Sequence, residues 1–461
     1  TTQNAFTVTI DPAFEGVYNP MPWDGKAVTL PVINEAAKTV TVSAPSDFAG
    51  FIKMVNGTDG ETANNFEGYT VTLTQDIDFG GHVVTPIADG ATRVGSSASG
   101  NVFKGTIDGN NHTIKNLTIP ASSKSSGIDA FIANLQGETA TLKNLKFENI
   151  TINSTTAEQT GIVGLLSNGA TVENVHILSG TIHGNQATGG VVGRVLKNGI
   201  VNNCSNNADI SSASTNVGGI VGAAYYSNKS ESNQMTISNC TNTGKVTGPK
   251  EVIGGIVGLN TGNVIGCVNK GTVTGTAEIS ASYSVGGIVG DQQWAGTIEN
   301  CVNEGDVINL SRSNNGTGGI IGWIRYSASS SSYQFKEVIS VIECTNKGNI
   351  RGYNSVGGIV GCCPGLANVI GCKNYSTNIS SYNWVAGIIG KIENNFPTAL
   401  SATSRVEVKD NLTTTTLEQM SVEETNPNSI KKSLVFNRNN PPHDPDNPVV
   451  IDENNTVPTS E

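Results

Sequence analysis

Six of the eight cysteines recur at one position of a repeating pattern, and they are the residues of this chain best suited to covalent or metal chemistry. They are Cys204, Cys240, Cys267, Cys301, Cys344 and Cys372. In an exported protein, such a series can form disulfides or hold a metal ion. Cysteines stacked in register have Cβ atoms about 4.8 Å apart, whereas a disulfide prefers roughly 3.5–4.5 Å. We therefore predict a ladder of buried, free thiols, testable by alkylation of the denatured chain and mass spectrometry.

Two further features accompany this ladder. Cys362 and Cys363 form a vicinal pair outside it, which could be oxidised, although plain packing is the simpler interpretation. An asparagine stands two residues after each ladder cysteine, at Asn206, Asn242, Asn269, Asn303, Asn346 and Asn374. We predict that these asparagines turn a corner that needs a left-handed backbone, and that their stacked amides hydrogen-bond along the molecule.

The histidines are weak candidates for metal binding. The five are His82, His112, His176, His183 and His443, and none has the spacing of metal ligands, so we interpret them as surface or corner residues. Calcium could bind Asp76-Ile77-Asp78, but the chain contains neither an EF-hand nor a glycine-rich nonapeptide calcium pattern. We expect no metal site and no cofactor.

Two acidic pairs, Asp76 with Asp78 and Glu299 with Glu343, are the best candidates for polysaccharide cleavage. The two carboxylates of a glycosidase stand about 5–9.5 Å apart, which residues on adjacent turns of a repeat can reach. Outward carboxylates on a repeat are usually solvated surface, so we predict no catalytic residue and no enzyme activity. Incubation with host and plant polysaccharides tests this, because any reducing-end or unsaturated product would contradict it.

Aromatic residues gather in the loops that follow one recurring motif, in a chain that is only 6% aromatic. They are Tyr225, Tyr226, Trp294, Trp323, Tyr326, Tyr333 and Phe335. Exposed aromatic faces pack against sugar rings or apolar partner surfaces, and Tyr and Trp contribute strongly to interfaces. These rings could instead merely cover the protein. We predict a binding site for a glycan or for a host or bacterial surface protein.

The recurring motif that must position these residues is Gly-Gly-Ile-Val-Gly. Full copies stand at 218–222, 254–258, 286–290 and 357–361, a copy with Ile in place of Val stands at 318–322, and weaker copies stand at 160–164, 189–193 and 386–390. A variable loop, a strand ending in cysteine, the asparagine and a third short strand follow each full copy. Three short strands and three corners per repeat describe stacked coils whose backbones pair with the coils above and below. A propeller would need four strands and repeats nearer forty residues, so we predict an all-β parallel β-helix of roughly ten coils.

The motif glycines are expected to allow positive φ and close approach at corners. An amphipathic helix at 46–56 should cap the first coil, because Phe48, Phe51, Ile52 and Val55 share one face. We divide the chain into an N-terminal β segment or wrap (1–45), the capping helix and loop (46–66), the β-helix (67–400), and terminal strands with a Pro- and Asn-rich tail (401–461).

Composition limits the class of partner. The net charge is −11 and no basic block is present, so nucleic acid is not an expected partner. No apolar run is long enough to span a membrane. The chain begins at Thr1, which we interpret as a trimmed product whose export signal has been removed.

The Gly219-Ile220-Val221-Gly222 copies resemble the GLUG motif of bacterial surface proteins, Gly-Leu-any-Gly, with Ile in place of Leu. The lead-in is also similar, from Trp23-Asp24-Gly25 through Asp76-Ile77-Asp78 to the segment 103–109, so that the resemblance covers roughly residues 20–390. It implies a Bacteroides-type exported adhesin built on a right-handed β-helix. The motif also occurs beside peptidase domains that cleave immunoglobulin A, but this chain has no His-Glu-x-x-His, so a zinc peptidase is not implied.

We therefore expect a non-enzymatic, monomeric, adhesin-like protein of the bacterial outer surface that binds through the loops on one corner of a rod. A lipid anchor on a removed N-terminal segment is one way to hold it there. The alternatives are a polysaccharide lyase or glycosidase on a β-helix, and a passive stalk that spaces a further domain.

Overall fold

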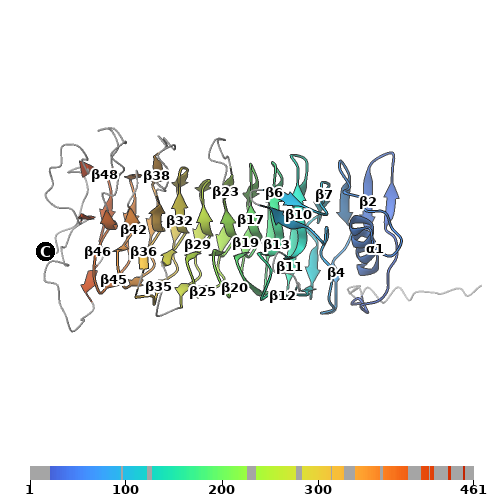
Figure 1. Ribbon diagram of the computed structural model, residues 1–461, viewed down its shortest axis with the longest axis horizontal. Coiled ribbons are helices and arrows are strands. Elements are labelled where there is room, and N and C mark those ends of the chain that lie inside the picture. Colours follow the sequence, from blue (N-terminus) through green and yellow to red (C-terminus); the bar gives the residue numbers. More distant parts are fainter. Residues whose placement is uncertain are drawn as a thin grey trace, which may run out of the picture.

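The computed structural model describes residues 21–94, 97–121, 127–225, 235–276, 283–312, 314–325, 338–363, 367–392, 406–414, 416–419, 435–437 and 450–451. Over these residues the chain forms a rod of stacked coils that begins and ends at opposite ends of the long axis (Figure 1). The predicted parallel β-helix is confirmed. Residues 1–20 and most of the predicted tail lie outside the described part.

Three sheets run along the rod, with 23 strands in sheet A, 10 in sheet B and 17 in sheet C. Successive coils pair in parallel. Among the described strands, the antiparallel exceptions are β1 (Val32–Asn34) with β2 (Thr39–Val42), and β5 (Thr92–Val94) with β6 (Ser97–Ser99). From Thr106 onward, each complete coil contributes to all three sheets in turn, so the backbone polar groups of its strands can pair with neighbouring coils.

The strands of sheet A lie in two rows. The first row holds β2, β3 (Thr70–Leu73), β7 (Thr106–Asp108), β11 (Thr141–Glu148), β14 (Thr171–Ile177), β18 (Ile200–Asn202), β23 (Thr236–Ser238), β28 (Asn263–Ile265), β33 (Thr297–Glu299), β38 (Ile339–Ile342), β43 (Ala367–Ile370), β48 (Val406–Lys409) and β52 (Val450–Ile451). The second holds β4 (Ile77–Asp78), β8 (Thr113–Lys115), β19 (Ser205–Asn206), β24 (Thr241–Asn242), β29 (Val268–Asn269), β34 (Val302–Asn303), β39 (Thr345–Asn346), β44 (Lys373–Asn374) and β49 (Leu412–Thr413).

Sheet B is a single row: β9 (Thr118–Ile119), β12 (Ile150–Asn153), β15 (Gly180–Gly184), β20 (Asp209–Ser212), β25 (Val246–Gly248), β30 (Val273–Gly275), β35 (Val307–Asn309), β40 (Ile350–Gly352), β45 (Asn378–Ser381) and β50 (Thr416–Gln419). Its inward positions are mostly valine and isoleucine, such as Ile210, Val246 and Val273, which are fully or almost fully buried.

Sheet C starts with the long strands β10 (Ile128–Gln136) and β13 (Gln159–Ser167) and then divides into two arms. The first arm is β16 (Ala187–Gly189), β21 (Val217–Gly218), β26 (Val252–Gly254), β31 (Tyr283–Gly286), β36 (Asn314–Gly318), β41 (Val356–Gly357) and β46 (Val385–Ala386). The second arm is β17 (Val192–Val195), β22 (Val221–Ala224), β27 (Val257–Asn260), β32 (Val289–Gln293), β37 (Ile321–Arg325), β42 (Val360–Cys363) and β47 (Ile389–Ile392), followed by β51 (Val435–Asn437).

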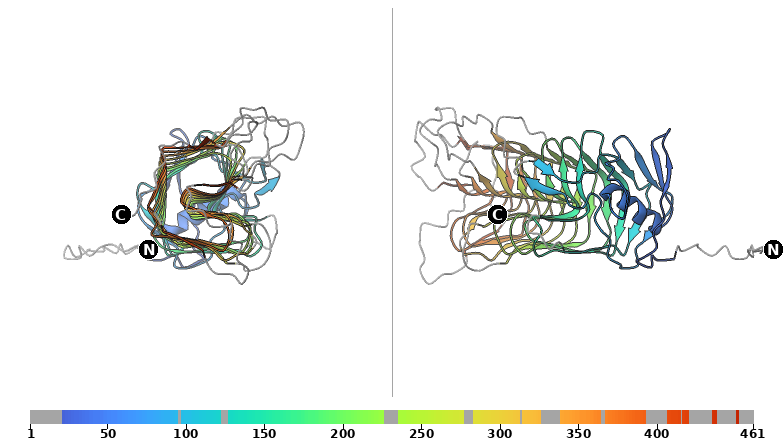
Figure 2. Two further views of the ribbon diagram at one scale, coloured as in Figure 1. Left: turned by 90° about the vertical axis from the view of Figure 1, so that its left-hand side faces the viewer. Right: turned by 45° about the vertical axis from the view of Figure 1, so that its right-hand side comes forward.

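The Gly-Gly-Ile-Val-Gly motif connects the two arms. Seen along the rod, each coil turns inward on one side (Figure 2, left panel). A Cβ atom on Gly218 would stand 2.0 Å from the Val221 carbonyl oxygen, and one on Gly222 would stand 2.4 Å from the Thr188 amide nitrogen. The arms therefore pack backbone against backbone, which only glycine allows.

The other motif positions face the interior. A Cβ on Gly219 would stand 2.4 Å from the side-chain Cγ of Asn242, whereas Ile220 and Val221 fill the core. The expected close approach is thus present. The expected positive φ is found at the corner glycines Gly266 and Gly371, but not at the motif glycines, whose role is to remove side chains.

The helix α1 (Pro45–Asn56) covers the first coils, as predicted (Figure 1). Phe48, Phe51, Ile52 and Val55 are buried. The Phe48 ring lies 5.9 Å from the ring of Phe79 and 5.4 Å from that of Phe131 between centroids. Left-handed Gly57 ends the helix at φ +65°, and its N–H bonds the Lys53 carbonyl.

The side chains of the second-row asparagines form an internal ladder. From Asn206 to Asn346, each Nδ2 donates to Oδ1 of the asparagine in the next coil at 2.8–2.9 Å, and to a carbonyl two residues further along its own chain at 2.8–3.0 Å. Asn374 ends the series by donating to Thr413 Oγ1 at 3.1 Å. All six asparagines are completely buried.

The prediction that these asparagines adopt a left-handed backbone was wrong. The left-handed residues are those directly before the cysteines: Asn203, Asn239, Gly266, Asn300, Glu343 and Gly371, with φ from +50° to +64°. They turn the corner between the two rows of sheet A. Asn206 and its counterparts come three residues later, at the inward-facing position of each second-row strand. Their amides therefore stack inside the rod.

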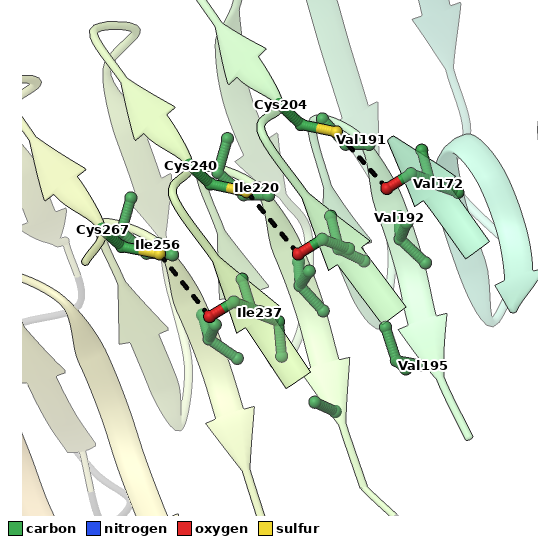
Figure 3. Close-up of a cluster of buried hydrophobic side chains, with 14 of the residues drawn as sticks. Val172, Val191, Val192, Val195, Cys204, Ile220, Ile237, Cys240, Ile256 and Cys267 are labelled. Atoms are coloured by element: carbon green, nitrogen blue, oxygen red, sulfur yellow. Dashed lines mark hydrogen bonds between the residues drawn. The ribbon is translucent and has the colours of Figure 1, made fainter. Parts of the chain in front are cut away.

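The six ladder cysteines are buried and free. Figure 3 shows Cys204, Cys240 and Cys267 stacked one above the other beside Ile220 and Ile256. The Cys204 Sγ lies 3.7 Å from the Val172 carbonyl oxygen of the preceding coil. Burial raises the pKa of the Cys240 thiol, so the protonated form needed for this packing is favoured. Cys362 and Cys363 are also buried and free.

Candidate binding face

A column of chemically unlike side chains runs along the outer face of the second arm. Its members are Arg194, Ala223, Leu259, Asp291, Trp323, Cys362 and Lys391, each in register with the next. We call this the charged column. Its neighbours in sequence, such as Val195, Ala224 and Ile324, belong to the apolar core, whereas members of the charged column do not. The column therefore faces away from the core.

Asp291 is the most unusual member, because it is a fully buried carboxylate. Its Oδ2 accepts from Arg325 Nη2 at 2.8 Å and from Gln293 Nε2 at 3.0 Å. Its Oδ1 has no hydrogen-bond partner among the described residues. Burial raises the pKa of Asp291 to about 6, although Arg325 and Gln293 act in the opposite direction.

Aromatic rings flank this carboxylate. The guanidinium of Arg325 lies 4.2 Å from the ring centroid of Trp323, the residue opposite Asp291 on the next coil. The rings of Tyr225 and Trp294 lie 5.1 Å apart at 48°. Trp294 is 9% exposed and has a left-handed backbone at φ +66°, which directs the chain away from β32 directly after the charged column.

Three of the seven predicted aromatic residues can thus be placed: Tyr225, Trp294 and Trp323. Tyr226, Tyr326, Tyr333 and Phe335 lie outside the described residues. The structure brings Tyr225 and Trp294 into contact and places Trp323 on the same arm. The segment between β22 and β23 spans residues 225–235, whereas that between β27 and β28 spans 261–262, so length varies at this corner. It also varies between β30 and β31, at another corner of the coil.

Arg194 begins the column and is 7% exposed. Its Nε is buried without a hydrogen-bond partner among the described residues. Burial, followed by the nearby charge of Arg93, lowers the pKa of Arg194 to about 10, and Glu158 only partly offsets this. Glu158 itself is held by Arg93, whose Nε and Nη2 both lie 3.1 Å from Glu158 Oε2.

Two flanking structures close the ends of this face. The hairpin β5–β6 covers its N-terminal end, where Ala91 and Ala98 pack with Leu165 and Leu196. At the C-terminal end, the buried Lys391 ammonium lies 4.2 Å from the ring centroid of Trp384. Both basic ends therefore contact either another strand or an aromatic ring.

The candidate acidic residues lie in or beside strands of sheet A. Asp76 accepts from the Thr113 amide and pairs with Lys115 at 2.9 Å. Burial alone would raise the pKa of Asp76, but these two partners lower it below its usual value, which is unsuitable for a general acid. Glu299 is in register with Ile342 rather than with Glu343, so the second pair does not face across adjacent coils.

Two of the five histidines, His176 and His183, have ordinary side-chain hydrogen-bond partners, and His443 lies outside the described residues. His176 bonds Ser205 Oγ through Nδ1 at 2.9 Å and Asn174 Oδ1 through Nε2 at 2.8 Å. His183 bonds Ser211 Oγ at 2.9 Å. Within the described ranges, no three His, Cys, Asp or Glu side chains are grouped closely enough to hold a metal ion. No helix among the described residues is long and apolar enough to cross a membrane.

The charged column was missed at the sequence level, although a signal for it exists. Each member directly follows the last glycine of a motif copy, as Asp291 follows Gly290. The motif and ladder positions repeat almost unchanged, whereas this position varies among arginine, alanine, leucine, aspartate, tryptophan, cysteine and lysine. A variable position inside an otherwise regular repeat indicates that packing of the repeat does not determine which residue type stands there.

Comparison with known proteins gives partial similarities. The chain is 31% identical over 197 residues to halomucin of Haloquadratum walsbyi, an alignment that covers 36% of this chain and 2% of halomucin. A crystal structure of a candidate immunoglobulin A1 protease from Bacteroides ovatus aligns with a TM-score of 0.44 and 20% identity, over 67% of this chain and 85% of that one. A structure described as IgA1 protease aligns with a TM-score of 0.42 and 17% identity, over 85% of this chain and 25% of that one. No protein-family model matches the chain.

Proposed function

We propose that this chain is the rod-shaped binding region of an extracellular bacterial surface protein, and that it binds glycans in an adhesin-like manner. The observation that carries the proposal is the charged column with its flanking rings. Buried Asp291 and Arg194, together with half-buried Trp323, occupy a face that contributes nothing to the core. Burying charge without full pairing costs stability, so such groups are typical of functional sites.

The scaffold suits a binding role. Sheet strands keep the outer residues in fixed register, and loops of variable length flank them, which is how rigid scaffolds present binding residues. Sugar rings pack their C–H faces on aromatic rings, while their hydroxyl groups bond buried polar side chains.

Hydrolysis is less well supported by the geometry. The raised pKa of Asp291 would suit a general acid, but glycosidases need a second carboxylate about 5–9.5 Å away. Asp291 is the sole carboxylate of the charged column, whose adjacent members are Leu259 and Trp323. Binding without turnover is therefore the preferred function.

A glycan and mucin binding screen tests the proposal. We expect the parent chain to bind, and Trp323→Ala to weaken binding at least tenfold with an unchanged melting temperature. Trp294→Ala should also weaken binding, but it should lower the melting temperature because this ring is only 9% exposed. Tyr375→Ala is the matched control, since Tyr375 is 41% exposed and lies after β44 in sheet A. Equal loss in all three variants, or no binding by the parent, would contradict the proposal. Products released during incubation would show an enzyme instead.

A further inference from the structure

Arg194 presents an unmet requirement for an anion. Its side chain is more than nine-tenths buried, and no described carboxylate lies within ion-pair distance of it. A guanidinium carries five N–H donors in a planar fork that matches a carboxylate. With a pKa of about 10, Arg194 remains charged at neutral pH. A buried, unpaired charge of this kind is costly unless a partner supplies the acceptor.

The surroundings of Arg194 do not supply that acceptor. Glu158 is paired with Arg93, whose Nε and Nη2 both contact its Oε2, and not with Arg194. The next member of the column is Ala223, whose methyl side chain has no hydrogen-bond acceptor to offer a guanidinium.

An aromatic surface and a second unsatisfied polar group lie further along the same arm. Tyr225, one residue beyond β22, is close enough to Arg194 for the charge of Arg194 to act on its phenol group, and its ring contacts Trp294. Asp291 Oδ1, three coils beyond Arg194, lacks a hydrogen-bond donor among the described residues. Strands of adjacent coils are about 4.8 Å apart, so roughly 14 Å separates the two positions.

We propose that Arg194 binds the carboxylate of an acidic sugar, either a sialic acid or a uronic acid, whose neighbouring sugars lie along the charged column toward Asp291. The ring pair Tyr225–Trp294 packs against a sugar face, and Asp291 Oδ1 accepts a hydroxyl or amide proton. This proposal rests on the glycan-binding function proposed above and specifies its ligand class.

A glycan fits this face better than an acidic peptide. Peptides in extended form usually bind by adding a strand to a free sheet edge. Here the arm strands β17, β22, β27 and β32 pair with the coils on both sides, so their backbones are already engaged. Only side chains remain to recognise a ligand.

The test is calorimetric titration of the full chain with 3′-sialyllactose, a hyaluronan tetrasaccharide, neutral lactose and hexaglutamate. We expect one of the two carboxylated sugars to bind at least tenfold more tightly than lactose, and its methyl ester to bind as weakly as lactose. Arg194→Met should lose about ten- to a hundredfold in affinity for that sugar, because a charge-assisted pair is removed. Arg351→Met, at an exposed arginine of sheet B, should bind like the parent.

Each outcome is decisive. If Arg194→Met binds the acidic sugar as the parent does, or if the methyl ester binds equally well, the assignment of Arg194 is wrong. Loss of binding in Trp294→Ala would still support the glycan-binding function in that case. A preference for hexaglutamate would replace the sugar by an acidic protein partner. The ester comparison uses the unaltered chain, so it does not depend on the folding of a variant.

Discussion

The side-chain amide of Asn269 donates to Asn303 Oδ1 at 2.8 Å, while its own Oδ1 accepts from Asn242 at 2.9 Å. Asn269 also donates to the Gly271 carbonyl at 2.9 Å. One buried side chain thus links three consecutive coils and closes its own corner. This arrangement repeats through the ladder, and it makes the stability of one coil depend on the next.

Replacing Asn269 by alanine should lower the free energy of unfolding by about 2–4 kcal/mol, because buried donors and acceptors on both neighbouring coils lose their partner. Asn207→Ala is the control; Asn207 is exposed and accepts one hydrogen bond, from Thr243. Asn207→Ala should lower the free energy of unfolding by about 0.5 kcal/mol or less. Chemical denaturation followed by circular dichroism measures both, and equal stability of the two variants would contradict a structural role for the ladder.

The motif glycines should not tolerate even alanine. A Cβ on Gly255 would stand 2.1 Å from the Gly287 carbonyl oxygen and 2.4 Å from Asn269 Cγ, so backbone would have to move. We expect Gly255→Ala to lower the free energy of unfolding by on the order of 4 kcal/mol, or to prevent folding. Gly275→Ala is the matched change, since its nearest atom is Val285 Cγ2 at 3.1 Å, a side-chain atom that can shift. Similar melting temperatures for the two would show that the chain is not closely packed around Gly255 and Asn269.

The left-handed corner before each cysteine should accept glycine or asparagine and reject a β-branched residue. Asn300 has φ +54°, and the same position holds Gly266 and Gly371 in other coils. We expect Asn300→Gly to change stability by less than about 0.5 kcal/mol, and Asn300→Val to lose about 1–3 kcal/mol through backbone strain. Thermal denaturation of the pair gives the answer, and a valine variant as stable as the glycine variant would refute the assignment.

Asp291 should make stability depend on pH. Its folded pKa of about 6 lies above the ordinary 3.8, so the folded state binds a proton more tightly than the unfolded state. Its contribution is fully present below pH 3.8 and is lost as the pH rises through 6. The melting temperature of the parent minus that of Asp291→Asn should therefore fall between about pH 5 and pH 7. A flat difference for Asp291→Asn would mean that this carboxylate does not titrate there.

The repeat made the architecture predictable from sequence. Regular spacing of the motif, the cysteines and the asparagines implies coils in register, and four apolar residues on one face implied the capping helix. The backbone of the corners was not predictable from residue type alone, because asparagine serves both as the left-handed residue at Asn203 and as the inward amide at Asn206. Only the direction of the strand that follows distinguishes these two uses.

The candidate site was only partly predictable. The aromatic residues Tyr225, Trp294 and Trp323 were found because aromatics are rare in this chain. Arg194 and Asp291 were missed because a single charged residue after a glycine resembles any surface position. Their burial arises from the inward turn of the coil and from the hairpin β5–β6, neither of which leaves a periodic pattern in the sequence.

The ladder also gives the rod a direction. Each asparagine from Asn206 to Asn346 donates a hydrogen bond to the asparagine of the following coil, and Asn374 donates one to the hydroxyl of Thr413. A coil that has just formed therefore offers an open donor, at a fixed place, to the segment that comes next. Starting from the end closed by α1, the chain can be laid down one turn at a time, each turn templated by its predecessor. Folding of this kind needs no finished C-terminus, so the coils can form in order from the N-terminal end.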